Sequence, residues 1–340
     1  MKSIILTGGS GTLGKYLMDE LVKKDFKIIL PLRSKSIQKT ITRIKCLAKG
    51  NAGIMNKFEI LEADLLQFNF GLSNKKLISL TKNTEYILHA AASTRLNSSL
   101  DQARENNVKT SRNIIKFAKN CTKLKRFGFI STAFVAGKRT GVILESELKR
   151  TAFINSYEQS KFEAELSVRE NLKTFPVNIF RPSIILTPKT DSNIINALTL
   201  GLFLARKGFL PILPGNGNYL LDLVKGGYVA EVIIKILLND YSDLTYHISS
   251  FKNSLSIKEL IKLLDIKKNL NIRFCGDEKS FNLELKKMTK LRPDLKLVYK
   301  KVESFLPELA YSKLFDNTNL LKNQESLTKR KIIEAIKILL

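Results

Sequence analysis

The sequence predicts an α/β protein with a doubly wound parallel Rossmann sheet and a smaller, mainly helical C-terminal lobe. Three observations support this fold class. An apolar strand from Ile4 to Leu6 runs directly into a glycine-rich turn over residues 7–14. Short apolar strands then alternate with helical patterns as far as about residue 186. Beyond that residue the alternation breaks, and lysine-rich helical patterns dominate residues 255–340.

The glycine-rich turn is the strongest functional motif in the chain. Glycine allows positive φ and lets a phosphate approach the backbone without a Cβ in the way. The amide groups that begin the following helix would face that anion along the positive end of the helix dipole. Because the motif lies between a strand and a helix, we interpret it as a dinucleotide site rather than an ordinary turn. The candidate pyrophosphate-binding residues are Gly8, Ser10, Gly11, Thr12, Leu13 and Gly14.

The end of the second predicted strand, residues 26–30, bears on the identity of the cofactor. In a Rossmann unit an acidic side chain at this place binds the free 2′-hydroxyl of NAD. The segment after the strand has no acid and instead offers Arg33, Ser34 and Lys35, which suit a 2′-phosphate. The sequence therefore favours NADP, with NAD as the alternative, although the surface of a basic protein would also carry such residues.

Two further strands end in residues suited to ligand contact. Strand 58–63 is followed by an Asp-Leu pair, whose carboxylate would either accept a hydrogen bond from the adenine amine or cap the next turn. Strand 86–89 runs into three alanines, which leave room for a ligand against the backbone. The candidate residues on these two strand ends are Asp64, Leu65, Ala90, Ala91 and Ala92.

A tyrosine and a lysine four residues apart, Tyr157 and Lys161, lie at the start of a helix predicted to run to about residue 172. At this spacing the two side chains share one helix face. A free phenol titrates near pH ~10, and a neighbouring ammonium favours the phenolate. We therefore expect Lys161 to lower the pKa of Tyr157, so that the phenol exchanges a proton near neutral pH.

Two polar residues complete the candidate catalytic group. Strand 126–130 ends in short hydroxyl residues that include Thr132, on the ligand-facing edge of a parallel sheet. A long helix predicted over residues 98–120 carries Asn107 in an asparagine pair. Because asparagine is a poor helix former, the pair indicates a kink or a side chain with a polar task.

Composition narrows the class of protein. The 340 residues carry a formal charge of +26, from 57 Lys and Arg against 31 Asp and Glu, spread over predicted helix faces without a basic block. This pattern argues against nucleic-acid binding and suits a phosphate-bearing cofactor or carrier. Three cysteines and two histidines, all widely separated, predict free thiols and no metal site. No secretory signal and no apolar stretch of ~20 residues occurs, so we expect a cytoplasmic protein.

The predicted organisation has two parts. Residues 1–186 would form the NAD(P)-binding domain, whose sheet also receives a strand near residues 244–248. Residues 187–243 and 249–340 would form the substrate-binding lobe, where insertions outside the strand ends bind substrates. The terminal helix, residues 329–340, has an apolar face flanked by basic residues. It would cover the core or touch an acidic membrane surface as a peripheral contact.

These motifs together resemble an extended short-chain dehydrogenase/reductase, and most closely the thioester reductase and fatty acyl-CoA reductase group. The superfamily motifs are the turn 7–14, Asp64-Leu65, His89-Ala90-Ala91-Ala92, Asn107-Val108, Tyr157 with Lys161, and Arg181-Pro182-Ser183. The group motifs are Phe70-Gly71-Leu72-Ser73, Ile130 to Gly137, Pro214-Gly215-Asn216-Gly217 leading to Leu221-Asp222-Leu223-Val224, and Phe315-Asp316-Asn317-Thr318. The chain departs from the pattern at Thr110, where glycine is usual, and at Gly227, where an acid commonly precedes the aromatic residue.

The resemblance implies a role for each matching residue. Tyr157 would be the general acid, Lys161 would hold the nicotinamide ribose, and Thr132 would bind the substrate oxygen. Asn107 would steady a proton-relay water, and the loop at Pro182 and Ser183 would face the nicotinamide carboxamide.

The implied activity is NADP-dependent hydride transfer to a carbonyl or acyl thioester of a lipid-like acyl group. The substrate would be a small molecule, free or carried on CoA or an acyl carrier protein, and the sequence specifies no oligomeric state. An NAD-dependent sugar-nucleotide epimerase or dehydratase and a non-catalytic NADP-sensing regulator are the alternatives.

Overall fold

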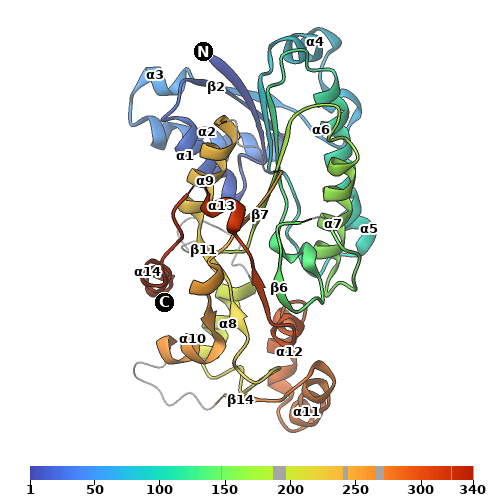
Figure 1. The fold of residues 1–340 in the computed structure, drawn as a ribbon, viewed down its shortest axis with the longest axis vertical. Helices are drawn as coiled ribbons and strands as arrows, with labels where there is room; N and C mark the ends of the chain where they lie inside the picture. Colours follow the sequence, from blue (N-terminus) through green and yellow to red (C-terminus); the bar gives the residue numbers. More distant parts are fainter. Residues whose placement is uncertain (147, 187–196, 240–243, 265–271, 323, 340) are drawn as a thin grey trace.

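The computed structural model describes residues 1–146, 148–186, 197–239, 244–264, 272–322 and 324–339 (Figure 1). Its centre is a seven-stranded sheet in the order β12-β7-β5-β4-β1-β2-β3, in which all neighbouring strands are parallel. This order confirms the predicted doubly wound class, because the strands proceed outward in both directions from β1 and β4. The strands are β1 (Lys2–Thr7), β2 (Phe26–Leu32), β3 (Phe58–Glu62), β4 (Tyr86–His89), β5 (Arg126–Ile130), β7 (Val177–Pro182) and β12 (Thr245–Ile248).

Helices cover both faces of this sheet (Figure 1). On one face, α1 (Thr12–Leu21) packs against α9 (Gly226–Leu238), and α1 buries Leu17 and Leu21, which share a helix face. On the other face, α6 (Thr110–Lys119) and α7 (Ser156–Arg169) contribute to a second apolar cluster. The other helices before residue 150 are α2 (Ser34–Ala48), α3 (Ala52–Met55), η1 (Phe68–Gly71), α4 (Asn74–Asn83), α5 (Leu100–Arg104), η2 (Glu105–Lys109) and η3 (Ala133–Ala136).

The helix predicted over residues 98–120 is present in three parts, α5, η2 and α6. The middle part, η2, is a π-helical turn that contains the asparagine pair. A π turn inserts one extra residue into the helix and is a common feature of functional positions. The expected irregularity is therefore confirmed, and its form is a π turn.

The C-terminal region is mainly helical, as predicted, and most of it lies below the sheet in Figure 1. Its helices are α8 (Ala197–Arg206), α10 (Ile257–Leu264), α11 (Glu278–Leu291), α12 (Pro293–Val302), α13 (Thr318–Leu321) and α14 (Lys329–Leu339), with the short turns η5 (Phe251–Asn253) and η6 (Leu306–Ala310).

Four small strand pairs also stabilise this region, and the sequence analysis missed most of them. They are β8 (Ile184–Leu186) with β11 (Leu223–Lys225), β6 (Gly141–Ile143) with β15 (Lys313–Phe315), β9 (Ile212–Leu213) with β14 (Arg273–Phe274), and β10 (Leu220–Leu221) with β13 (Leu255–Ser256). Strands of two or three residues are too short to show a period-two hydrophobic pattern, which explains the omission.

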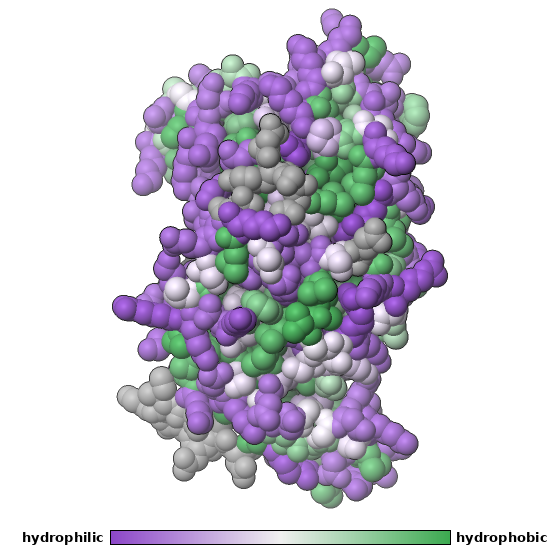
Figure 2. Space-filling model, in the orientation of Figure 1, coloured by the Kyte–Doolittle hydropathy of each residue, from purple (hydrophilic) through white to green (hydrophobic). Residues whose placement is uncertain are grey.

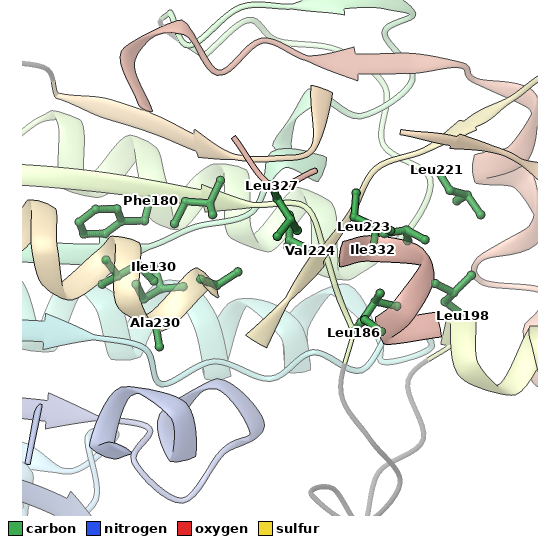
Figure 3. Close-up of a cluster of buried hydrophobic side chains, with 14 of the residues drawn as sticks. Ile130, Phe180, Leu186, Leu198, Leu221, Leu223, Val224, Ala230, Leu327 and Ile332 are labelled. Atoms are coloured by element: carbon green, nitrogen blue, oxygen red, sulfur yellow. The ribbon is translucent and has the colours of Figure 1, made fainter. Parts of the chain in front are cut away.

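One apolar cluster joins the sheet to the C-terminal region. Figure 3 shows Ile130 and Phe180, which lie in the sheet strands, in the same cluster as Leu198 and Leu221. Residues 187–196, which follow the predicted domain boundary at residue 186, lie outside the described residues. Because one cluster contains buried residues of both parts, the described C-terminal segments pack against the sheet.

The terminal helix α14 contributes to this core. Ile332 and Ile336 are fully buried, whereas Ile338 is 72% exposed. The apolar face of α14 therefore covers the core. Within the described ranges, no helix combines the length and the apolar character that crossing a bilayer requires. Hydrophilic side chains dominate the face in Figure 2, with apolar side chains gathered toward its middle.

Candidate functional site

The glycine-rich turn packs directly against the end of β4. Gly8 has φ of +74°, and a Cβ added there would lie 2.7 Å from the carbonyl carbon of Ala90 and from the amide nitrogen of Ala91. The amide of Gly11 donates to the Gly8 carbonyl over 2.9 Å. A Cβ on Gly14 would overlap the Gly8 carbonyl oxygen. Only glycine at positions 8 and 14 therefore permits this tight turn, and α1 begins beside it with no side-chain cap on its first turn.

A buried hydrogen-bonded chain fixes the loop after β4. The Thr7 hydroxyl accepts from the Ala91 amide over 3.2 Å and bonds His89 Nδ1 over 2.7 Å. On its other side, His89 Nε2 lies 3.2 Å from the Ser111 hydroxyl. Burial, reinforced by the charge of Lys161, lowers the pKa of His89 to about 3. His89 is therefore a neutral structural residue, and the loop with Ala90 to Ala92 has a defined position.

Thr132 and Tyr157 meet at the end of β5. Thr132 directly precedes η3, and its hydroxyl accepts from the Phe134 amide over 3.3 Å. The Thr132 hydroxyl lies close enough to the Tyr157 phenol to lower its pKa. Tyr157 lies on the first turn of α7, and the side chain of Asn155 caps this turn. The two hydroxyl groups thus form one polar pair at the edge where a dinucleotide binds in this fold.

The pKa of Tyr157 departs from the sequence-based expectation. Burial raises the pKa of Tyr157 to about 12, and the Thr132 hydroxyl only partly opposes this. Lys161 does not lower it, because its ammonium donates to the Ile130 carbonyl over 2.7 Å and lies 4.5 Å from the centre of the Phe129 ring. The expectation of a lowered phenol pKa is therefore wrong for this arrangement.

Lys161 is itself an unusual group, since it is only 3% exposed. Burial lowers the pKa of its ammonium to about 8, against the opposing effect of Glu165. The residue is thus placed one helical turn after Tyr157, as the spacing predicted, with an ammonium that titrates close to neutral pH.

Asn107 connects the loop after β4 to helix α7. Its side-chain amide donates to the Ser160 hydroxyl over 2.9 Å and to the Ser93 carbonyl over 3.1 Å, and its oxygen accepts from the Ser93 amide over 2.7 Å. Ser160 in turn donates to the Tyr157 carbonyl over 3.0 Å. The side chain of Ser160 thus connects Asn107 to the backbone of Tyr157. The role of Asn107 in holding a proton-relay water stays a prediction.

The basic residues at the end of β2 have an acidic neighbour. Arg33 precedes α2, Ser34 and Lys35 begin it, and all three are exposed. The Ser34 hydroxyl donates to the carboxylate of Glu62, the last residue of β3. Glu62 does not follow β2 in sequence, so the residue pattern at this strand end did not indicate an acid. The parallel register, which pairs Leu32 with Glu62, brings the acid there.

The remaining candidates lie at the carboxyl ends of their strands. Asp64 accepts from the Leu66 amide over 3.0 Å, so its carboxylate caps the turn that follows β3, which was one of the two expectations. Leu65 is buried in the core. Pro182 ends β7, and the amide of the next residue, Ser183, donates to the Ile248 carbonyl over 3.0 Å.

A buried ion pair anchors α7 to the sheet. Arg181 on β7 and Glu165 on α7 are separated by 2.7 Å and are almost fully buried. The Ser131 hydroxyl donates to the same carboxylate over 2.6 Å. Burial acts to raise the pKa of Glu165, but Arg181, Arg169 and Ser131 outweigh it and the pKa is lowered. The strand end before Thr132 is therefore tied to the helix that carries Tyr157.

Comparison with known proteins gives consistent results. A family model described as Male sterility protein, an NAD-binding family, matches residues 6–233. Fatty acyl-CoA reductase wat of Drosophila melanogaster is 26% identical over 223 residues, which cover 55% of this chain and 43% of that protein. Fatty acyl-CoA reductase 2 of Homo sapiens is 26% identical over 300 residues, or 73% of this chain and 58% of that protein. The chain thus spans about half the length of these curated relatives.

Solved structures share the fold over the whole chain. The terminal R domain from the myxalamid PKS-NRPS biosynthetic pathway has a TM-score of 0.80 at 23% identity, covering 100% of this chain and 90% of that chain. UDP-glucuronic acid 4-epimerase from Bacillus cereus, in complex with NAD, has a TM-score of 0.68 at 17% identity, covering 99% of this chain and 96% of that chain. At these identities the likeness concerns the fold.

Proposed function

Since the chain belongs to the Male sterility protein family of extended short-chain dehydrogenases/reductases, we propose that it is a reductase that transfers hydride from NADPH to a carbonyl or acyl thioester. The observation that carries the proposal is the placement of the Thr132 hydroxyl beside the Tyr157 phenol at the end of β5, with Lys161 one helical turn after Tyr157. In this proposal Tyr157 is the general acid. The family membership bears out the resemblance seen in the sequence motifs.

The residues at the strand ends fit a nicotinamide dinucleotide. Gly8 and Gly14 permit the tight turn, because a Cβ at either position would meet backbone atoms. The first turn of α1 has no side-chain cap and would face the pyrophosphate. Arg33 and Lys35 would pair with a 2′-phosphate, and Lys161 would hold the nicotinamide ribose. The reduced nicotinamide supplies the hydride when it is bound.

The side chains of the chain then handle the substrate oxygen. Thr132 and Tyr157 present two hydroxyl donors to the carbonyl oxygen, where negative charge develops as hydride adds to the carbonyl carbon. With a pKa of about 12, the phenol is fully protonated at neutral pH and holds the proton that the new oxyanion needs. The raised pKa thus suits a proton donor better than a proton acceptor.

A thioester substrate would follow the same first step. Hydride addition to the acyl carbon and proton transfer from Tyr157 give a hemithioacetal, which collapses to an aldehyde and a free thiol. The curated relatives are named fatty acyl-CoA reductases, which favours a lipid-like acyl group on a phosphopantetheine carrier. The charge of +26 favours the approach of such an anionic carrier.

The test is a substrate panel with purified protein. NADPH or NADH would be mixed with acyl-CoA esters, long-chain aldehydes or UDP-sugars, and loss of reduced-cofactor absorbance would be followed. We expect turnover with an acyl thioester or aldehyde and NADPH. Conversion of a UDP-sugar without net cofactor consumption would replace this proposal with an epimerase. Cofactor binding without turnover of any substrate would favour a sensing role.

A further inference from the structure

A cluster of buried charged side chains lies behind the first turn of α7. Glu158, Glu308 and Lys313 come from α7, η6 and β15 and are 3%, 2% and 1% exposed. The sequence motifs gave no indication of this cluster, and the proposed reaction does not use it. Glu158 directly follows Tyr157 in the chain, so the cluster lies next to the proposed general acid.

One carboxylate oxygen of Glu308 accepts hydrogen bonds, and the other has no hydrogen-bond donor among the described residues. Lys313 forms an ion pair with Glu308 Oε1, and the Tyr219 hydroxyl donates to the same oxygen over 3.3 Å. The Lys313 ammonium also lies 5.8 Å from the centre of the Phe134 ring. Glu308 Oε2 is buried and receives no hydrogen bond from the N–H and O–H donors of the described residues. The carboxyl of Glu158 is an acidic neighbour of Glu308, and each of the two acids affects the pKa of the other.

Glu158 is held firmly by the start of its own helix. Its carboxyl accepts from the Ile154 amide over 3.0 Å and from the Asn155 side-chain amide over 3.2 Å. Its backbone amide donates in return to Asn155 Oδ1 over 3.0 Å. This reciprocal arrangement resembles a capping box and fixes both the Glu158 side chain and the first turn of α7.

The charge of the cluster does not balance if both acids are ionised. Two carboxylates and one ammonium would leave one uncompensated negative charge in a space without solvent, which is strongly unfavourable. Two neighbouring buried carboxyl groups resolve this by sharing one proton, as closely spaced acids do. The same proton supplies the donor that Glu308 Oε2 lacks.

We propose that Glu158 is a neutral carboxylic acid that donates its proton to Glu308, and that this pair positions Tyr157 and keeps negative charge away from its phenol. The inference rests on the proposed function, in which Tyr157 is the general acid. Glu158 is then a positioning residue. Its partners Glu308 and Lys313 make the C-terminal region part of the support for the active site.

The electrostatics agree with this geometry. Burial, followed by the charge of Glu308, raises the pKa of Glu158 to about 8, while Lys313 acts in the opposite direction. A negative charge on Glu158 raises the pKa of Tyr157 further, and it also acts on Tyr219. The charged and titratable groups that interact with Glu158 include Glu308, Lys313, Tyr157 and Tyr219.

The shared proton is tested by stability, independently of activity. Between the pKa of an unfolded glutamate and about 8, the folded wild type binds one more proton than the unfolded chain, so its stability falls as pH rises. Glu158→Gln keeps a donor toward Glu308 and removes the titration. We expect the melting temperature of the wild type to fall between pH 5 and 8 by about 2 °C per pH unit more than that of E158Q.

Glu163→Gln is the matched control on the same helix. Glu163 pairs with Arg104 over 2.7 Å near the surface, and its pKa is lowered, so E163Q should show the wild-type decline between pH 5 and 8. If the melting temperatures of the wild type, E158Q and E163Q declined equally between pH 5 and 8, the proposal of a shared proton would be wrong.

The positioning role is tested by kinetics. Lys161 also titrates near pH 8, so the readout is the difference between the wild type and E158Q. We expect kcat of the wild type to fall more than that of E158Q above pH 8, and Glu158→Ala to lower kcat at least tenfold with KM for NADPH unchanged. Superimposable pH profiles would overturn the role. If no variant turns over substrate, the proposed reaction fails, while the melting data still decide on the proton.

Discussion

Replacing Gly14 by alanine tests whether the tight turn before α1 depends on a missing side chain. A Cβ at this position would overlap the Gly8 carbonyl oxygen and lie 2.7 Å from the Gly9 Cα. Both contacts are with backbone atoms of the turn, which cannot rotate away as a side chain can. The turn must therefore move, and with it the amides that would face the pyrophosphate.

The magnitude follows from two opposing effects. Alanine is favoured over glycine inside a helix by about 1 kcal/mol. Overpacking of a filled space costs about 1–3 kcal/mol, and contacts with backbone belong at the upper end of that range. We therefore expect Gly14→Ala to lower the free energy of unfolding by about 2 kcal/mol, and to weaken NADPH binding about tenfold, which corresponds to about 1.4 kcal/mol.

Gly201→Ala is the matched control. Gly201 also lies in a helix, α8, but a Cβ added there would meet no heavy atom of the described residues within 4 Å. Only the helical preference remains, so this variant should gain about 0.5–1 kcal/mol and bind NADPH like the wild type. Urea denaturation and cofactor fluorescence titration measure both quantities. If G14A matched G201A in stability and in cofactor affinity, a Cβ at position 14 would not disturb the turn.

Three further predictions concern catalysis, the buried ion pair and the cofactor. Tyr157→Phe should lower kcat by about 10²–10⁴ with the Kd for NADPH unchanged, measured by steady-state kinetics and titration, and a small loss would exclude Tyr157 as general acid. Arg181→Met leaves the buried Glu165 carboxylate with Arg169 still paired to it and should cost about 1.5–3 kcal/mol in urea denaturation, whereas a cost below about 1 kcal/mol would show that the pair contributes little. Folding lowers the pKa of Glu165, so its ionised carboxylate stabilises the protein above the pKa of an unfolded glutamate. This stabilisation is lost as the pH falls through the pKa of Glu165 in the folded protein, and melting temperatures measured at decreasing pH test this. Arg33→Ala should lower the ratio of kcat/KM with NADPH to kcat/KM with NADH, because it removes a cation that would pair with the 2′-phosphate. Glu62→Gln should raise this ratio, because it removes a negative charge at the same place. An unchanged ratio in both variants would mean that the 2′-phosphate binds elsewhere.

The sequence predicted the fold class well because its signals are local. The strand, turn and helix at residues 2–21 and the later alternation of strands and helices are patterns within short windows, and a parallel sheet follows from that alternation. The edge at which Thr132 and Tyr157 meet follows as well, because the carboxyl ends of parallel strands lie together. Neither conclusion needs a long-range side-chain contact.

The contacts that tune the site were not predictable in the same way. The i, i+4 spacing showed that Tyr157 and Lys161 share a helix face, but a flexible four-carbon side chain can reach several partners, and here the ammonium binds the Ile130 carbonyl. Glu62 reaches Ser34 through strand pairing, which requires the register of β2 with β3. Glu158 meets Glu308 across 150 positions of sequence, and no local pattern encodes such a contact.

Helix α7 is therefore held from two sides, and this arrangement determines where Tyr157 can lie. On the sheet side, Glu165 binds Arg181 and Ser131, so the helix cannot slide along β7 without exposing a buried charge. On the lobe side, Glu158 is a neighbour of Glu308 in the C-terminal region. The first anchor fixes the depth of the helix against the sheet. Because Tyr157 lies on the first turn next to Glu158, we expect a change in the C-terminal region to reach the phenol through Glu158.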